Sequence, residues 1–372
     1  MKKILLRSML FMLLVILVLI GIIAFNTIRF SSKQIQVEAA KKIEIGDEYI
    51  ERLRRAIRIQ NISFSDHIDS SAFRQMSTFL DTQFPRVDSL LEKKIFSEFS
   101  RLYYWPGKNA ELKPILLMAH LDVVPIEEAT RENWTRPPFS ADIHDGQIWG
   151  RGTLDDKGSV LSILESVEML LADGYQPARG IYLAFGHDEE VSGKRGAAKI
   201  SNYLKEQNIN FEYVLDEGMV IVGGALPGLD KPVALVGISE KGYTTLKLTV
   251  QLEEGGHSSM PPAETAIEIL SKAILQLRAH PFPANLEGPM QELINHVGPE
   301  MNLTNKAVFA NLWLFEGILK GQLSKSNSAN AIIRTTTAPT VFNKLCVCLT
   351  PAIRGFNLPI LPLTALLITD PV

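Results

Sequence analysis

Histidine and carboxylate residues gather in four short motifs, each of which follows a run of apolar residues. Imidazole and carboxylate ligands without thiolate suit zinc, manganese or cobalt, and a carboxylate that bridges two ions would allow a two-metal site. The sequence therefore predicts metal chemistry that uses oxygen and nitrogen ligands only. The motifs are HLD (120–122), GRGTLDDKG (150–158), HDEE (187–190) and DEG (216–218).

The spacing within these motifs suggests separate roles for their members. Residues two apart on a strand face the same side, so Asp122 can accept a hydrogen bond from the ring of His120 and fix its tautomer. The adjacent acids Glu189 and Glu190 suit a division between metal binding and proton transfer. Each motif alone is common on ordinary protein surfaces, and it is their joint occurrence at strand ends of one domain that favours a catalytic site.

The segments that carry these motifs predict an α/β domain. Apolar runs at 114–125, 180–190 and 211–218 have the composition of buried strands, and 159–175 has the period of an amphipathic helix. Strands that alternate with helices indicate a mostly parallel sheet. In such sheets ligands bind beyond the carboxyl ends of the strands, where the polar motifs fall.

A change of pattern near residue 240 predicts a second domain of the α+β class. Leu246, Leu248, Val250 and Leu252 alternate as in a sheet covered on one face, and residues 264–280 follow with helical period. The final segment, 341–372, is apolar, interrupted by prolines, and contains both cysteines of the chain. Two cysteines in 372 residues exclude a disulfide framework and a zinc site built from four cysteines.

The first 30 residues predict entry into the secretory pathway. Lys2, Lys3 and Arg7 precede an apolar run from Met9 to Phe25, which suits either a cleaved signal peptide or an uncleaved membrane anchor. In both cases the rest of the chain would be lumenal or extracellular. Asn-x-Ser/Thr sequons at Asn61, Asn133 and Asn302 agree with a secreted glycoprotein. The net charge of −3 gives no indication of nucleic-acid binding.

Together the motifs resemble those of the M20 metallopeptidases, a family of carboxypeptidases and aminoacylases. MAHLDVVP, GRGTLDDKG, GHDEE and VLDEG match its metal-site motifs in order, and EKG (240–242) and GGHSSMPP (255–262) resemble its lid domain. NAIIRTTTAPT (330–340) resembles the secreted N-fatty-acyl-amino-acid synthase/hydrolase branch. The resemblance implies a zinc-peptidase catalytic domain with an inserted α+β lid that forms a homodimer, with expected segments 1–30 (leader), 31–240 (catalytic), 241–340 (lid) and 341–372 (unmatched tail).

The resemblance also implies a role for each motif residue. His120 and Asp216 would bind one zinc, Glu190 the second, and Asp155 both, while Asp122 would orient His120. Glu189 would be the general base, and His257 would reach across the dimer to stabilise the oxyanion. The implied substrate is a small N-acyl amino acid or dipeptide, and the implied cofactor is two Zn²⁺.

The match ends after Thr340, where the family supplies a further zinc-binding histidine and a lid arginine for the substrate carboxylate. No histidine follows His296, so we expect a C-terminally truncated form whose second zinc lacks a ligand. Three hypotheses follow: a dizinc amidohydrolase that cleaves and forms N-fatty-acyl amino acids, a Gly-Xaa dipeptide carboxypeptidase, and an inactive truncated isoform that binds ligand without turnover.

Overall fold

The fold is described from a computed structural model of the chain. It describes residues 2–64, 67–224, 228–242, 244–250, 259–343, 346–351 and 367–369. The chain divides into two compact units, one formed by residues 39–218 and the other by residues 1–38 together with 219–372. The two units are described separately below, as the 39–218 unit and the 219–372 unit.

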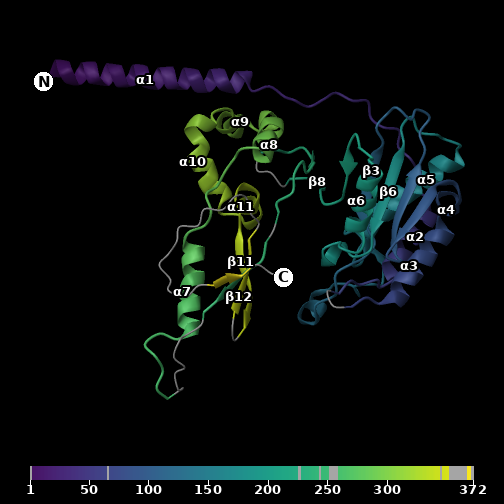
Figure 1. Cartoon of the computed structure of the whole chain (residues 1–372). Coiled ribbons are helices and arrows are strands. Elements are labelled where there is room, and N and C mark those ends of the chain that lie inside the picture. Colours follow the sequence, from purple (N-terminus) through teal and green to yellow (C-terminus); the bar gives the residue numbers. More distant parts are fainter. Residues whose placement is uncertain are drawn as a thin grey trace. The chain divides into compact units, whose positions relative to one another are not determined.

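The 39–218 unit contains a mixed sheet with helices on both faces (Figure 1). Its helices are α2 (Asp47–Arg58), α3 (Ser70–Gln83), α4 (Pro85–Leu90), α5 (Lys157–Ala172) and α6 (Ala197–Glu206), with 3-10 turns η1 (Glu128–Asn133) and η2 (Glu189–Val191). Its strands are β1 (Glu92–Phe96), β2 (Ser100–Trp105), β3 (Ile115–His120), β4 (Asp142–His144), β5 (Gln147–Trp149), β6 (Ile181–Gly186) and β7 (Val214–Leu215).

The main sheet has the strand order β1-β2-β6-β3-β7. Strand β3 lies parallel to both β6 and β7, so the chain segments that follow these three strands emerge at one edge of the sheet. Strands β1 and β2 form an antiparallel hairpin that joins the other side of β6. The expectation of a mostly parallel sheet therefore holds for the strands that carry the motifs and is wrong for β1 and β2.

Side chains alternate between two hydrophobic clusters on the faces of this sheet. Leu183 and Phe185 of β6 join the cluster beneath α2, α3, α4 and α5, whereas Ala184 between them joins the cluster beneath α6. This alternation is the two-residue period of a strand buried on both faces. Both faces are thus covered, and the carboxyl edge of β3 and β6 is left for polar residues.

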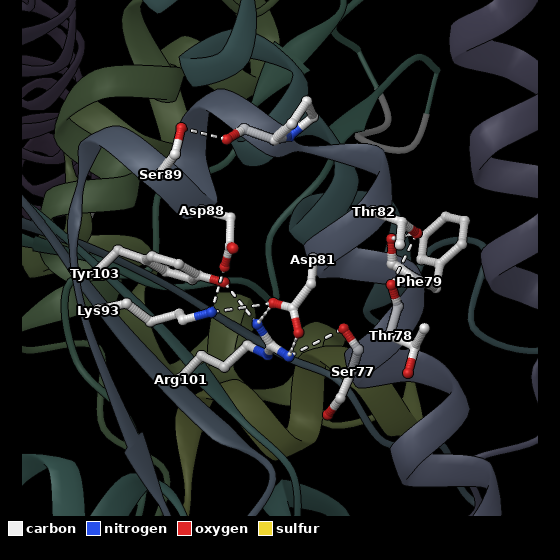
Figure 2. A network of polar contacts seen from close by, with 11 residues as sticks. Ser77, Thr78, Phe79, Asp81, Thr82, Asp88, Ser89, Lys93, Arg101 and Tyr103 are labelled. Carbon is white, nitrogen blue, oxygen red and sulfur yellow. Dashed lines mark hydrogen bonds and ion pairs between the residues drawn. The ribbon is translucent and has the colours of Figure 1, made fainter.

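A buried ionic network connects the hairpin with α3 (Figure 2). The guanidinium of Arg101 on β2 donates to both carboxylate oxygens of Asp81, at 2.5 and 3.1 Å, and also to the Ser77 carbonyl and the Tyr103 hydroxyl. The Arg101 side chain is 3% exposed and that of Asp81 is 37% exposed. Lys93 reaches Asp81 from β1, so the network fixes the hairpin to the helical layer.

The 219–372 unit has a long N-terminal helix, a small sheet and a group of short helices. Its helices are α1 (Lys2–Arg29), α7 (Ala266–Ala279), α8 (Pro289–Val297), α9 (Leu303–Ala310), α10 (Leu312–Leu323) and α11 (Asn327–Ile333), with the 3-10 turn η3 (Gly298–Glu300). Its strands are β8 (Ile221–Val222), β9 (Val233–Ala234), β10 (Leu246–Thr249), β11 (Thr337–Asn343), β12 (Cys346–Pro351) and β13 (Leu367–Thr369).

Two features of this unit lie near the expected domain limits. The division into compact units falls after Gly218, and the β8–β9 hairpin belongs to the second unit. Part of the unmatched tail also forms strands, since β12 and β13 pair antiparallel with β10 on either side. Strand β11 pairs with β12, which gives the sheet order β11-β12-β10-β13.

Candidate metal centre

His120 is the last residue of β3, and both of its ring nitrogens have acidic neighbours. Its Nδ1 lies 3.0 Å from the Asp122 carbonyl oxygen and 3.4 Å from the Asp122 carboxylate, while its Nε2 lies 2.8 Å from Asp155 Oδ1. Both nitrogens face acceptors, so Nδ1–H donates to Asp122, and a metal ion bound at Nε2 would replace the proton that otherwise bonds to Asp155. This is the orientation a metal-binding imidazole requires.

The turn at 150–158 brings Asp155 to this imidazole. Gly152 has a φ of +84°, and a Cβ there would lie 2.8 Å from the Val123 side chain, so the close turn requires glycine. The peptide between Asp155 and Asp156 is cis. Asp156 is fully buried and its Oδ2 accepts from the backbone N–H of His120 at 3.1 Å, which connects the turn to the end of β3.

Asp122 positions the two glutamates of the third motif. Its carboxylate is fully buried, with Oδ1 accepting from the Glu189 N–H and Oδ2 from the Glu190 N–H, both at 3.1 Å. Burial acts to raise the pKa of Asp122, but the hydrogen bonds from His120, Ser63 and the Glu190 amide outweigh it and hold the pKa below its usual value. Asp122 therefore stays charged and connects three motif residues.

The resulting cluster fits a metal ion. His120, Asp155 and Glu190 each offer a ligand atom, and the three atoms lie within 4.8 Å of one another. Nitrogen and carboxylate donors at such separations suit zinc and related ions. Glu189 Oε2 lies 3.9 Å from His120 Nε2, close enough to act on a molecule bound at the same place.

The charges in the cluster also favour a cation. Burial, reinforced by the charge of Asp155, raises the pKa of Glu190 to about 7, and burial together with nearby acids raises that of Glu189. Burial alone would lower the pKa of His120, but its hydrogen bonds to Asp122 and Asp155 raise it to about 10. Several carboxylates thus lie close together with little positive charge nearby, and a bound divalent ion would reduce the repulsion between them.

Other residues of the expected site lie differently. Asp216 follows β7, is exposed, and accepts from the Glu217 N–H at 3.0 Å, and it is outside the group of ligand atoms within 4.8 Å. His257 lies outside the described residues. His187 is buried among Phe73 and Phe99, and its Nδ1 lies 2.6 Å from Ser100 Oγ.

Sequence reasoning missed two supporting residues in the turn, Asp156 and Lys157. Lys157 is buried, and its Nζ donates to the carbonyls of Ala56 and Ile59 at the end of α2, at 3.0 and 2.5 Å. It therefore ties the turn that carries Asp155 to a helix of the core. A charged pair beside a glycine turn was the only available signal, and it indicates an exposed loop as readily as a buried support.

Comparisons with known proteins point to one family. Residues 116–300 match the description "Peptidase family M20/M25/M40". The chain is 45% identical over 354 residues to "Probable carboxypeptidase S-like 2" of Dictyostelium discoideum, which covers 92% of this chain and 66% of that protein. It is 44% identical over 299 residues to "N-fatty-acyl-amino acid synthase/hydrolase PM20D1" of Xenopus tropicalis, which covers 79% of this chain and 58% of that protein.

A solved structure supports the same fold. An M20 family metallo-carboxypeptidase from Sulfolobus solfataricus matches with a TM-score of 0.52 and 18% identity, covering 82% of this chain and 71% of that structure. The expected fold class is thereby confirmed. The chain spans 66% and 58% of the lengths of the two relatives named above.

Proposed function

Because the chain belongs to peptidase family M20/M25/M40, we propose that it is a metal-dependent amidohydrolase that cleaves, and in reverse forms, the amide bond of N-fatty-acyl amino acids. The observation that carries this proposal is the juxtaposition of the ligand atoms of His120, Asp155 and Glu190 with Glu189 alongside. The relative named as a synthase/hydrolase supplies the substrate class.

The residues of the 39–218 unit divide the reaction between them. His120, Asp155 and Glu190 would hold one or two zinc ions, with Asp216 as a further ligand and Asp122 fixing the imidazole. Bound zinc would polarise the scissile carbonyl and acidify water. Glu189 takes a proton from the attacking water while the water oxygen bonds to the carbonyl carbon. Glu189 then delivers that proton to the amine nitrogen as the C–N bond breaks.

Glu189 is suited to this work by its surroundings. Burial and the neighbouring acids raise its pKa, and a raised carboxylate pKa brings its proton affinity nearer to that needed at neutral pH. The oxyanion role of His257 and the lid-mediated homodimer belong to the same proposal, as does location in the secretory pathway.

A second candidate is a carboxypeptidase that acts on Gly-Xaa dipeptides. It is favoured by the Dictyostelium relative, whose name is carboxypeptidase S-like and whose match extends over 92% of this chain. Both candidates use the same metal centre and differ in the substrate group on the acyl side of the amide.

The test uses the full chain purified in detergent. We expect bound zinc by elemental analysis and release of phenylalanine from N-oleoyl-phenylalanine faster than hydrolysis of Gly-Leu. Glu189→Gln should reduce turnover by about 10²–10⁴-fold and retain zinc, whereas Glu190→Gln should lose zinc. Glu212→Gln, at an exposed acid paired with Arg179, is the matched control and should change neither.

Three results would contradict the proposal in different ways. A chain with no zinc and no turnover of either substrate would support the ligand-binding isoform without catalysis. Faster hydrolysis of Gly-Leu would support the carboxypeptidase. Equal loss of zinc in the Glu189 and Glu190 variants would show that the base and ligand roles are wrongly divided.

A further inference from the structure

Helix α10 exposes an apolar face. Trp313, Leu314 and Ile318 are 58%, 39% and 71% exposed. Leu314 and Ile318 are four residues apart and so lie on one side of the helix, which Trp313 and two glycines complete. We call this face the α10 stripe: Trp313, Leu314, Gly317, Ile318 and Gly321. None of these five residues is charged, and Lys320, which borders the stripe seven residues after Trp313, forms an ion pair with Glu316.

The α10 stripe begins beside a buried polar contact with α1. Asn311 immediately precedes α10 and is fully buried. Its Oδ1 accepts from Asn26 Nδ2 at 2.9 Å and from Trp313 Nε1 at 3.2 Å, and its Nδ2 donates to the Ile23 carbonyl at 3.3 Å. A buried amide that bonds to two positions of another helix holds that helix in a defined place. The end of α1 is therefore part of the folded unit.

The chain that follows α1 is also held in the unit. Phe30 packs into the hydrophobic cluster formed by helices α8 to α11. Helices α9 and α10 accordingly lie next to the C-terminal end of α1 (Figure 1). Removal of α1 near residue 25 or 30 would expose Asn311 and part of this cluster, so the contacts favour a helix that stays attached.

The remainder of α1 has the length of a membrane span. Among the described residues α1 is long and apolar enough to cross a bilayer, and its side chains are largely exposed from Lys3 to Ile22. At 1.5 Å per residue, the part of that stretch without charged residues, from Ser8 to Ile22, covers about 22 Å. The long side chains of Lys3 and Arg7 can extend to the headgroups on the far side, which allows the helix to cross a hydrocarbon layer of about 30 Å. The contacts with Asn311 start at Ile23, where the apolar span would reach the membrane surface.

We propose that α1 remains a membrane anchor and that the α10 stripe lies on the bilayer, with Trp313, Leu314 and Ile318 inserted at the interface beside the end of α1. The occupant of the stripe is lipid. Tryptophan at the edge of the acyl region, with its indole N–H bonded and its ring exposed, suits this environment, and an amphipathic helix with an apolar face suits interfacial binding. The proposal is independent of the enzymatic activity.

The test measures contact between Trp313 and lipid in the full chain. The chain is reconstituted into phosphatidylcholine vesicles with either ordinary or brominated acyl chains, and the emission of Trp313 is taken as the difference between the wild type and Trp313→Phe. We expect brominated lipid to remove most of this difference. Trp134→Phe, which removes a tryptophan of the 39–218 unit, is the control and should leave the brominated-lipid loss in place.

The proposal fails if the Trp313 emission is the same in both lipids. It also fails if the chain is dimeric in these vesicles and Ile318→Ser abolishes the dimer, because the stripe would then be covered by a second copy. Recovery of a mature chain that begins after residue 25 would overturn the anchor itself.

Discussion

The Arg101–Asp81 pair offers a quantitative test of how the hairpin is held to α3. In Asp81→Asn the guanidinium of Arg101, with a side chain only 3% exposed, keeps its charge but loses its carboxylate partner. Loss of one partner of a fully buried pair costs about 3–5 kcal/mol, and loss of an exposed one about 0–1 kcal/mol. Since Asp81 is 37% exposed, we expect a decrease of about 2–3 kcal/mol in the free energy of unfolding.

Urea unfolding of the full chain in detergent measures this decrease. The indole of Trp105 is buried in the same cluster as Tyr103 and reports exposure of the core. With an m-value of about 2–3 kcal/mol/M, the midpoint should fall by about 1 M. Asp88→Asn is the matched control, because Asp88 pairs with Lys93, whose side chain is 27% exposed, instead of with the buried Arg101. It should lower the midpoint far less.

The same pair gives a signed pH dependence. Burial acts to raise the pKa of Asp81, but the hydrogen bonds and charges of Arg101 and Lys93 outweigh it and hold the pKa below 3.8. The stabilisation is therefore complete above the unfolded pKa of 3.8 and is lost as the pH falls through the lower folded value. Asp81→Asn should lack this acid loss. Equal midpoints for Asp81→Asn and Asp88→Asn at neutral pH would refute the reasoning.

Two further predictions concern residues that support the metal centre. Asp122→Asn should weaken zinc binding about 10–100-fold, because its carboxylate fixes both His120 and the amides of Glu189 and Glu190; unchanged affinity in a zinc titration would contradict this. Lys157→Met should lower the free energy of unfolding by about 1–3 kcal/mol, because the Ala56 and Ile59 carbonyls lose their donor. An increase in the urea midpoint would contradict this, because it would show that the desolvation of the buried amine exceeds the stabilisation from its two hydrogen bonds.

The parts of the site that could be predicted from sequence are those governed by strand geometry. His120 ends a buried strand and Asp122 follows it, while Glu189 and Glu190 follow the neighbouring parallel strand, so one edge of the sheet brings them together. This argument needs only the direction of the strands. The two-residue period of a strand does not apply to this pair, because Asp122 lies beyond the end of β3.

Other features depend on tertiary contacts that sequence patterns do not show. The β1–β2 hairpin was missed because Lys93, Lys94 and Arg101 interrupt its apolar alternation, and Arg101 is buried only because Asp81 comes from another element. Asp156 and Lys157 look like a solvated loop until the carbonyls and amide they contact are known. The strands formed by residues 346–351 and 367–369 lie within the apolar, proline-interrupted segment 341–372, whose sequence shows no two-residue alternation that would predict them.

The way Asp122 holds the two glutamates has a consequence for how the site can be altered. Its carboxylate accepts hydrogen bonds from the backbone N–H groups of residues 189 and 190, and the side chains of these residues take no part in those bonds. The side chains at these two positions can therefore be exchanged without dismantling the framework beneath them. Histidine or aspartate at position 190 could therefore be used to change the metal preference. Natural substitutions at positions 189 and 190 could likewise change the chemistry of the site while the fold that supports it stays the same.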